Sequence, residues 1–146
     1  MEVVIMVGVS GSGKSTYIKD KLKEHLVCSA DSYFMDGDKY NFNPAKLGDA
    51  HRSCMKRFVE SCVGGVEKIV VDNTNTSIDQ LAPYYSVARA FNYSVKLVML
   101  EAPAEVCVER NSHGVNKKTI DGMSFNLSRL KIPPYWDCVI VKEKTF

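Results

Sequence analysis

Residues 8–15 read GVSGSGKS, a complete match to the phosphate-binding pattern G-x-x-x-x-G-K-[ST]. The motif lies between an apolar stretch and a helical pattern, which is the context that it requires. Its glycines permit backbone angles at which successive N–H groups converge on phosphate oxygens, and the following helix adds its positive end. The sequence therefore predicts a site for ATP. The residues expected to hold it are Gly8, Ser10, Gly11, Ser12, Gly13, Lys14, Ser15 and Thr16.

Two side chains of the motif and one carboxylate are expected to act on the triphosphate. Lys14 is expected to reach the β- and γ-phosphates, and the Ser15 hydroxyl to ligate Mg²⁺. Asp72 ends the apolar run KIVVD. An aspartate at the carboxyl end of a strand beside a phosphate loop is placed to hold Mg²⁺ or its waters. Ser15 and Asp72 are therefore the predicted metal residues.

A further carboxylate, Asp31, stands in the stretch VCSADSYF, directly after a short apolar run. A carboxylate at the end of the second strand opens onto the same sheet edge as the phosphate loop. There it can accept a proton from a hydroxyl aligned with the γ-phosphate. Ser29 and Asp31 are also good helix caps, so position alone leaves a catalytic base and a structural cap equally open.

The stretch VERNSHGVNKK, residues 108–118, combines a helix end, a glycine and two lysines. This composition is typical of a lid that closes cations over a nucleotide, and the predicted lid covers residues 110–131. Arg110 is the cation expected to face the phosphates. The alternative is a solvated helix hairpin with charges of no catalytic role.

These residues need elements that bring the ends of several strands to one edge. Strands are predicted from apolar runs at 3–7, 25–29, 68–71, 95–100 and 138–141. Helices are predicted between them at 14–23, 44–63, 77–91, 103–111 and 117–131. Asn43 and Ser77 are expected caps, the latter in a capping box with Gln80. The alternation predicts an α/β sandwich of the P-loop kinase type, with a five-stranded parallel sheet, helices on both faces and a helical lid.

Composition restricts the class of protein without choosing a partner. A length of 146 residues predicts a single domain over residues 1–146, and a net charge of +2 neither requires nor excludes nucleic acid. Five cysteines without a CxxC pair favour buried thiols in a reducing compartment. The opening residues contain too few apolar side chains for a secretory signal peptide or a membrane-spanning helix. A cytoplasmic protein with no membrane partner is expected.

The motifs together resemble a known family. GxxGSGKST, SADSYF, VVDNTN and ERNSHGVNKKTI follow one another in the order found in the phage polynucleotide 5′-hydroxyl kinase. They are still more similar to a small P-loop kinase domain of a Nedd-binding protein family of animals. This resemblance covers about Val3 to Pro134. It implies transfer of the ATP γ-phosphate to a polynucleotide 5′ end, with Asp31 as general base, Asp72 at the metal and Arg110 in the lid.

The sequence departs from the phage enzyme at two places in the acceptor site. That enzyme has arginines where this chain has Phe34 and, approximately, His113. Phe34 either stacks on a base or closes an edge of the core, and His113 either binds phosphate or is solvated. Both differences affect the expected binding of a polynucleotide more than the expected kinase chemistry.

Four other residues are candidates for the acceptor site. Asn73 and Asn75 follow Asp72, where they either contact the acceptor or only shape a turn. His51 and Arg52 lie on the predicted second helix and either reach the acceptor or face water. Under the alternative in which the basic residues face water, the residues that pack inward are Phe42, Leu47, Met55 and Phe58.

Two other functions compete with a polynucleotide kinase. A nucleoside, a sugar or a hydroxymethylated base in DNA would use the same phosphate loop and the same aspartate. A nucleotide-hydrolysing module acting through a protein partner would need no base at Asp31. No guanine-reading NKxD segment occurs, which disfavours a GTPase. The oligomeric state is not predicted.

Overall fold

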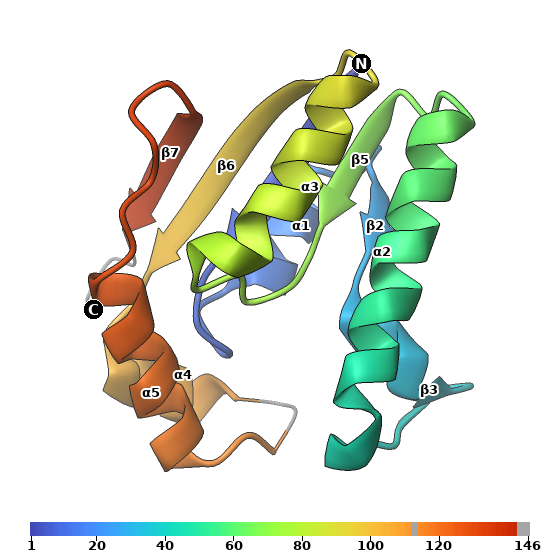
Figure 1. Cartoon of the computed structure of the whole chain (residues 1–146). Coiled ribbons are helices and arrows are strands. Elements are labelled where there is room, and N and C mark those ends of the chain that lie inside the picture. The colour runs from blue at the N-terminus through green and yellow to red at the C-terminus, as the bar shows by residue number, and fades with distance from the viewer. Residues whose placement is uncertain (112–113, 143–146) are drawn as a thin grey trace.

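The computed structural model describes residues 1–111 and 114–142, and its centre is a parallel sheet (Figure 1). The order of its five strands is β2-β5-β1-β6-β7, and each neighbouring pair is parallel. The strands are β1 (Glu2–Val7), β2 (Leu26–Cys28), β5 (Lys68–Val71), β6 (Ser94–Glu101) and β7 (Asp137–Lys142). Two short antiparallel strands, β3 (Met35–Asp36) and β4 (Lys39–Tyr40), form a separate hairpin. The predicted five-stranded parallel sheet is confirmed.

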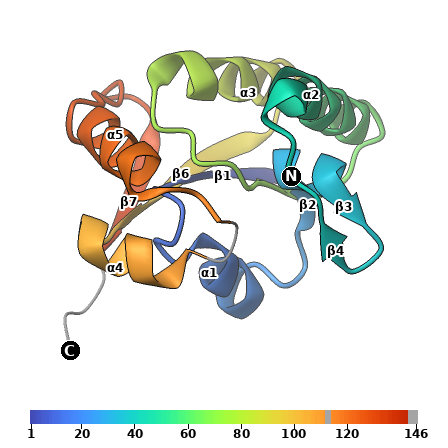
Figure 2. The same cartoon turned by 90° about the horizontal axis from the view of Figure 1, so that it is seen from below.

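Helices cover both faces of the sheet, as predicted. Figure 2 shows α2 and α3 on one face and α1 on the other, with α4 and α5 beside the end of β6. The α-helices are α1 (Lys14–Lys21), α2 (Leu47–Val63), α3 (Ile78–Ala90), α4 (Ala104–Arg110) and α5 (Lys117–Ser128). Two 3₁₀ helices, η1 (Ala30–Phe34) and η2 (Pro44–Lys46), complete the set. The fold is the predicted α/β sandwich.

The strand sequences divide their side chains between two cores because alternate residues point to opposite faces. In β1, Val3, Ile5 and Val7 join the core beneath α2 and α3. Val4 and Met6 join the smaller core beneath α1. A central parallel strand is covered on both faces, so every residue of β1 after Glu2 is apolar.

Two helix starts differ in detail from the prediction. The region expected as one helix from Pro44 is a 3₁₀ turn, capped by the side chain of Asn43, followed by α2 from Leu47. The expected capping box at Ser77 is wrong, because the Ser77 side chain makes no cap hydrogen bond. The Gln80 side chain instead accepts the backbone N–H of Thr76 at 2.9 Å.

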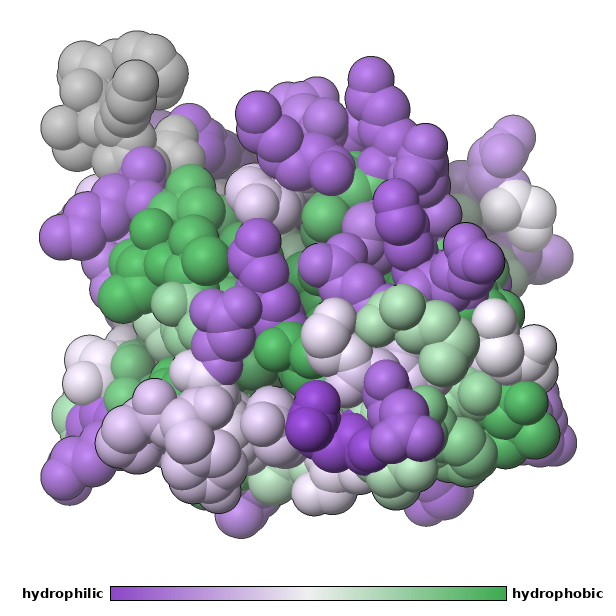
Figure 3. Space-filling model, turned by 90° about the horizontal axis from the view of Figure 1, so that it is seen from above, coloured by the Kyte–Doolittle hydropathy of each residue, from purple (hydrophilic) through white to green (hydrophobic). Residues whose placement is uncertain are grey.

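The two edges of the sheet differ in character. The edge at the amino ends of the strands is a mixture of hydrophilic and hydrophobic side chains (Figure 3), and ion pairs such as Lys68–Glu24 at 2.8 Å lie there. At the carboxyl ends lie the phosphate loop, η1, α4 and α5, seen together from below in Figure 2. Within the described residues, no helix is both long and apolar enough to cross a membrane.

Candidate active site

The phosphate loop connects β1 to α1 at the carboxyl edge of the sheet. Gly13 precedes the helix with φ of 101°, a left-handed conformation that favours glycine. The Lys14 ammonium donates to the carbonyl oxygens of Gly8 at 2.9 Å and Val9 at 3.0 Å. The Ser12 hydroxyl is buried with no hydrogen-bond partner in the described part of the chain. An unpaired buried donor is costly, so this loop is suited to receive acceptor oxygens such as those of a phosphate.

Gly11 has no room for a side chain, because α4 lies against it. A Cβ atom at Gly11 would lie 2.2 Å from the carbonyl oxygen of Cys107. Val9, Cys107 and Ile120 form a small buried cluster between the loop, α4 and α5. The predicted lid helices are therefore packed directly against the phosphate loop.

The predicted metal residues face one hollow. Asp72 lies directly after β5, and it lines a cavity of about 310 Å³ together with Ser15 and Thr16 of α1. Ser15 and Thr16 are exposed, so their hydroxyls are accessible. A carboxylate and a hydroxyl are hard oxygen donors of the kind that Mg²⁺ prefers.

The 3₁₀ helix η1 answers whether Asp31 is a cap. Ser29 is the N-cap, and its hydroxyl accepts the backbone N–H of Asp31 at 3.2 Å. Asp31 lies in the first turn, where its carboxylate is exposed and accepts a hydrogen bond from the Tyr40 hydroxyl at 3.0 Å. Because Ser29 supplies the cap, capping does not account for the Asp31 carboxylate.

Electrostatics link the three charged residues. Burial lowers the pKa of Lys14, while the negative charges of Asp72 and Asp31 oppose that shift. Both carboxylates therefore lie close enough to act on the Lys14 ammonium. Residues from the ends of β1, β2 and β5 thus meet at one edge, as the parallel topology requires.

The two asparagines after Asp72 hold this edge together. The Asn73 side-chain oxygen accepts the backbone N–H of Ala30 at 2.9 Å, and its nitrogen donates to the Cys54 sulfur at 3.5 Å. The Asn75 nitrogen donates to the carbonyl oxygen of Met6 at 2.9 Å. Asn75 is only 2% exposed and has a positive φ of 51°. These contacts favour the structural alternative, in which both side chains shape the loop.

Phe34 also takes the structural alternative. It is 5% exposed and lies in the main core, with its ring edge-on to the rings of Tyr33, Tyr40 and Phe42. This burial favours the alternative in which Phe34 closes an edge of the core over the one in which it stacks on a base. The alternative for the second helix is confirmed for Phe58, which is fully buried, and for Met55, which packs against the main core. It is wrong for Phe42 and Leu47, which are 48% and 43% exposed.

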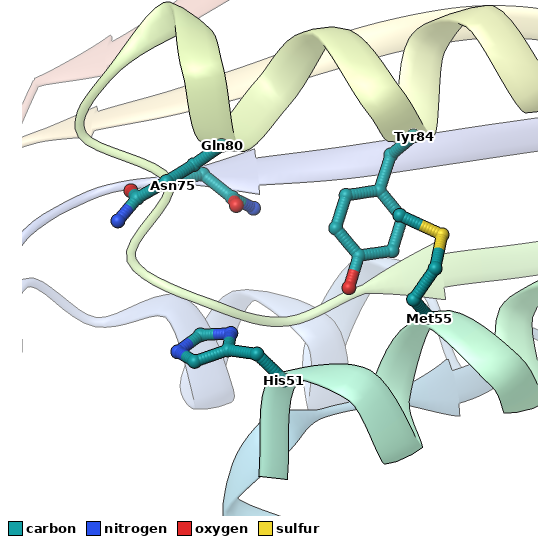
Figure 4. Close-up of a pocket in the computed structure, with 5 residues that line it drawn as sticks. All are labelled: His51, Met55, Asn75, Gln80 and Tyr84. Carbon is teal, nitrogen blue, oxygen red and sulfur yellow. The ribbon is translucent and has the colours of Figure 1, made fainter. Parts of the chain in front are cut away.

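His51 and Arg52 are adjacent in sequence but differ in surroundings. His51 lines a pocket between α2 and α3 with Met55, Gln80 and other residues (Figure 4). The Arg52 guanidinium pairs with Asp49 in the first turn of α2 and is 76% exposed. The helix therefore places His51 at the pocket and engages Arg52 along its own surface.

In the predicted lid, Arg110 is the last residue of α4 and Lys117 the first of α5. Lys117 pairs with Asp121 one turn later at 2.9 Å. His113 lies outside the residues that the structure describes, so its predicted role at phosphate stays a prediction. The limits of the lid at residues 110–131 stay a prediction as well.

Sequence reasoning overlooked Tyr40 as a partner of Asp31. The signal was the DGD sequence at residues 36–38, because Asp-Gly between short extended runs favours a hairpin. In that hairpin Met35 pairs with Tyr40, which brings the tyrosine back toward η1. The turn residues therefore indicated the hairpin that brings Tyr40 to Asp31.

Comparison with known proteins identifies the family of the chain. A family model described as an AAA domain matches residues 3–119. Human NEDD4-binding protein 2 is 29% identical over 97% of this chain. A protein of Autographa californica nuclear polyhedrosis virus, whose name describes a bifunctional polynucleotide kinase/RNA ligase, is 26% identical over 75% of it. The resemblance to the Nedd-binding family and to polynucleotide kinases is thereby confirmed.

A solved structure shares the fold. A chain of the Pnkp1/Rnl/Hen1 RNA repair complex superimposes with a TM-score of 0.70 and 18% identity, over 88% of this chain and 44% of its own. The match to the human relative covers 8% of its length, and the match to the viral relative covers 18%. This chain thus corresponds to one part of each. Because the family model covers most of its residues, the chain belongs to the AAA domain family.

Proposed function

We propose that this chain is a kinase that transfers the γ-phosphate of ATP to the 5′-hydroxyl of DNA or RNA. The observation that carries the proposal is that β2, β5 and β1 are neighbours in the sheet, so that Asp31, Asp72 and Lys14, which follow these strands, lie at the same edge. A protein that only hydrolyses nucleotide needs a phosphate loop and a metal carboxylate. This chain has in addition an exposed carboxylate after the second strand, where a hydroxyl acceptor would be activated.

The phosphate loop would hold the triphosphate through backbone N–H groups and the Lys14 ammonium. On binding, Lys14 would exchange the carbonyl oxygens of Gly8 and Val9 for phosphate oxygens of opposite charge. Charge develops on the transferring phosphoryl group, so a fixed cation there stabilises the transition state. Arg110 at the end of α4 is the proposed second cation.

Asp31 would act on the acceptor. Its carboxylate accepts the proton of the attacking hydroxyl as the new O–P bond forms, while the bond between the γ-phosphorus and the bridging oxygen breaks and ADP leaves. The Tyr40 hydroxyl holds one carboxylate oxygen at 3.0 Å. This hydrogen bond would keep the carboxylate in place for the acceptor hydroxyl.

Ser15 and Asp72 fit a magnesium ion. Both line the same hollow, and their oxygens suit a hard cation. Among the described residues there is no cluster of three or more His, Cys, Asp or Glu side chains able to hold a metal. This pattern fits Mg²⁺, which is usually held by one or two protein oxygens together with ATP phosphates. When bound, the ion would neutralise charge on the β- and γ-phosphates.

The choice of a polynucleotide acceptor rests on the relatives. The viral relative and the RNA repair complex carry names that include a polynucleotide kinase or RNA repair. The chemistry at Asp31 would serve a sugar or nucleoside hydroxyl equally well. The acceptor must therefore be tested directly.

The test is label transfer from γ-labelled ATP to 5′-hydroxyl DNA and RNA oligonucleotides, with Asp31→Asn alongside the wild type. The wild type should label the oligonucleotides, and Asp31→Asn should lower the rate about 10²–10⁴-fold while ATP binding persists. Asp36→Asn, an exposed aspartate on the β3–β4 hairpin, is the matched control and should keep the wild-type rate. ATP binding without labelling of any oligonucleotide would refute the polynucleotide acceptor.

A further inference from the structure

The pocket between α2 and α3 has a buried floor and a polar rim. It has a volume of about 270 Å³ and is lined by His51, Met55, Asn75, Gln80 and Tyr84. Figure 4 shows two side chains from α2 facing two from α3, with Asn75 contributed by the loop between β5 and α3. On each helix the two residues are four positions apart and so lie on one face.

The floor is apolar and closed. Tyr84 is 5% exposed, and its hydroxyl donates to the Cys54 sulfur at 3.2 Å, so its ring presents an apolar surface to the pocket. The Met55 thioether lies beside this ring (Figure 4). An aromatic ring next to a polarizable thioether suits a flat, unsaturated ligand.

The rim offers hydrogen-bonding groups. The Gln80 side-chain oxygen is used by the Thr76 N–H, which leaves its amide N–H₂ as a donor. The His51 ring can donate or accept, and both His51 and Gln80 are exposed. An apolar floor with donors and acceptors at its edge is the arrangement that recognises an unstacked nucleobase.

Contacts connect the pocket to both halves of the proposed reaction. The Cys54 sulfur accepts hydrogen bonds from both the Tyr84 hydroxyl and the Asn73 side chain. Asn73 in turn accepts the backbone N–H of Ala30, the residue before Asp31. On the other side, the carbonyl oxygen of Thr74 accepts the N–H of Gly8 at 2.9 Å. The pocket is therefore linked, through Cys54 and Asn73, to the backbone that carries Asp31.

The volume limits what can enter. Pockets for drug-sized ligands have volumes of about 300 Å³ or more. A pocket of about 270 Å³ therefore accepts one ring system and excludes a stacked base pair. Resting on the proposed kinase function, we propose that this pocket receives the base of the acceptor's 5′-terminal nucleotide, flipped out of any duplex. His51 and Gln80 would hydrogen-bond its edge.

The experiment compares single-stranded oligonucleotides that are identical except at the 5′-terminal position. One series carries each of the four bases there, and one oligonucleotide carries an abasic 5′-terminal nucleotide with its 5′-hydroxyl retained. We expect kcat/KM for ends that carry a base to exceed that for the abasic end by about tenfold, which corresponds to the stacking of one base.

Two variants assign the effect to the pocket. His51→Ala removes an exposed rim group, and Gln80→Glu keeps the oxygen that Thr76 requires while removing the amide donor. Both variants should lower the ratio of kcat/KM for ends that carry a base to kcat/KM for the abasic end. Lys56→Ala is the matched control, because its side chain is 79% exposed on the same helix and does not line the pocket. It should keep the wild-type ratio, and thermal melting of each variant verifies its fold.

Each outcome decides a different question. Equal transfer to intact and abasic ends, or a ratio that neither rim variant changes, would overturn the base pocket and leave the kinase standing. Absence of transfer to every oligonucleotide would overturn the polynucleotide acceptor and the base pocket together. A ratio narrowed by both rim variants and kept by Lys56→Ala supports the pocket.

Discussion

The Tyr40 hydroxyl donates a hydrogen bond to the Asp31 carboxylate across 3.0 Å, from the second strand of a hairpin to the 3₁₀ helix that precedes it. Burial and the neighbouring carboxylate raise the pKa of Tyr40 above its ordinary 10, so the hydroxyl remains a donor at neutral pH. The hairpin thereby orients the proposed base. Four predictions follow from contacts of this kind.

Tyr40→Phe should lower kcat for phosphate transfer about tenfold, because the carboxylate loses a charge-assisted hydrogen bond while the ring stays in place. KM for ATP should not change, since the phosphate loop is untouched. Steady-state kinetics measures both constants. Tyr33→Phe is the control, because Tyr33 is a 44% exposed member of the same aromatic cluster. An equal loss in both variants would mean that the ring cluster matters and the hydroxyl does not.

Asp72→Asn should raise the Mg²⁺ concentration needed for half-maximal transfer by about tenfold or more, because one charged oxygen ligand is lost from the hollow shared with Ser15. Titration of activity with Mg²⁺ at saturating ATP measures the shift. Asp20→Asn removes an exposed carboxylate from α1 and should leave the titration unchanged. A normal Mg²⁺ requirement in Asp72→Asn would exclude Asp72 from the metal site.

Gly11→Ala should lower the free energy of unfolding by about 2–4 kcal/mol, because its φ of 84° is left-handed and the new methyl meets the Cys107 carbonyl oxygen. Urea unfolding followed by fluorescence of Trp136, the single tryptophan, measures the change. Gly122 lies within α5 with open space around it, so Gly122→Ala should stabilise by up to about 1 kcal/mol. Unchanged stability in Gly11→Ala would show that α4 gives way easily.

Stability should fall as pH rises from 9 to 11, in part because of Cys28. Burial raises the pKa of this thiol from 9.0 to about 11, so the unfolded chain releases its proton first. Fewer bound protons in the unfolded state mean that stability decreases with pH in this window, by up to about 2–3 kcal/mol from this group.

The measurement is urea unfolding at several pH values in wild type and Cys28→Ala. The variant loses the contribution of Cys28, so its stability should decline less steeply between pH 9 and 11. Parallel declines would mean that the Cys28 thiol is not responsible.

The sequence alone determined the order of strands and helices and the phosphate loop. Apolar runs such as that of β1 report burial on both faces, and GVSGSGKS carries its own backbone requirement within eight residues. The ends of β2 and β5 placed Asp31 and Asp72 at one edge, because parallel strands present their carboxyl ends together. Information of this kind is local, or follows from topology.

Tertiary packing decided what each nearby side chain does. Composition could not tell whether Phe34 faced an acceptor or the core, because that depends on the hairpin folding its aromatic rings around it. The contact of Gly11 with Cys107 joins residues 96 positions apart in sequence. Tyr40 reaches Asp31 only because the hairpin packs against η1. Tyr84 and His51 line the same pocket only because α3 packs against α2. Contacts between distant segments depend on packing geometry, which no single stretch of sequence encodes.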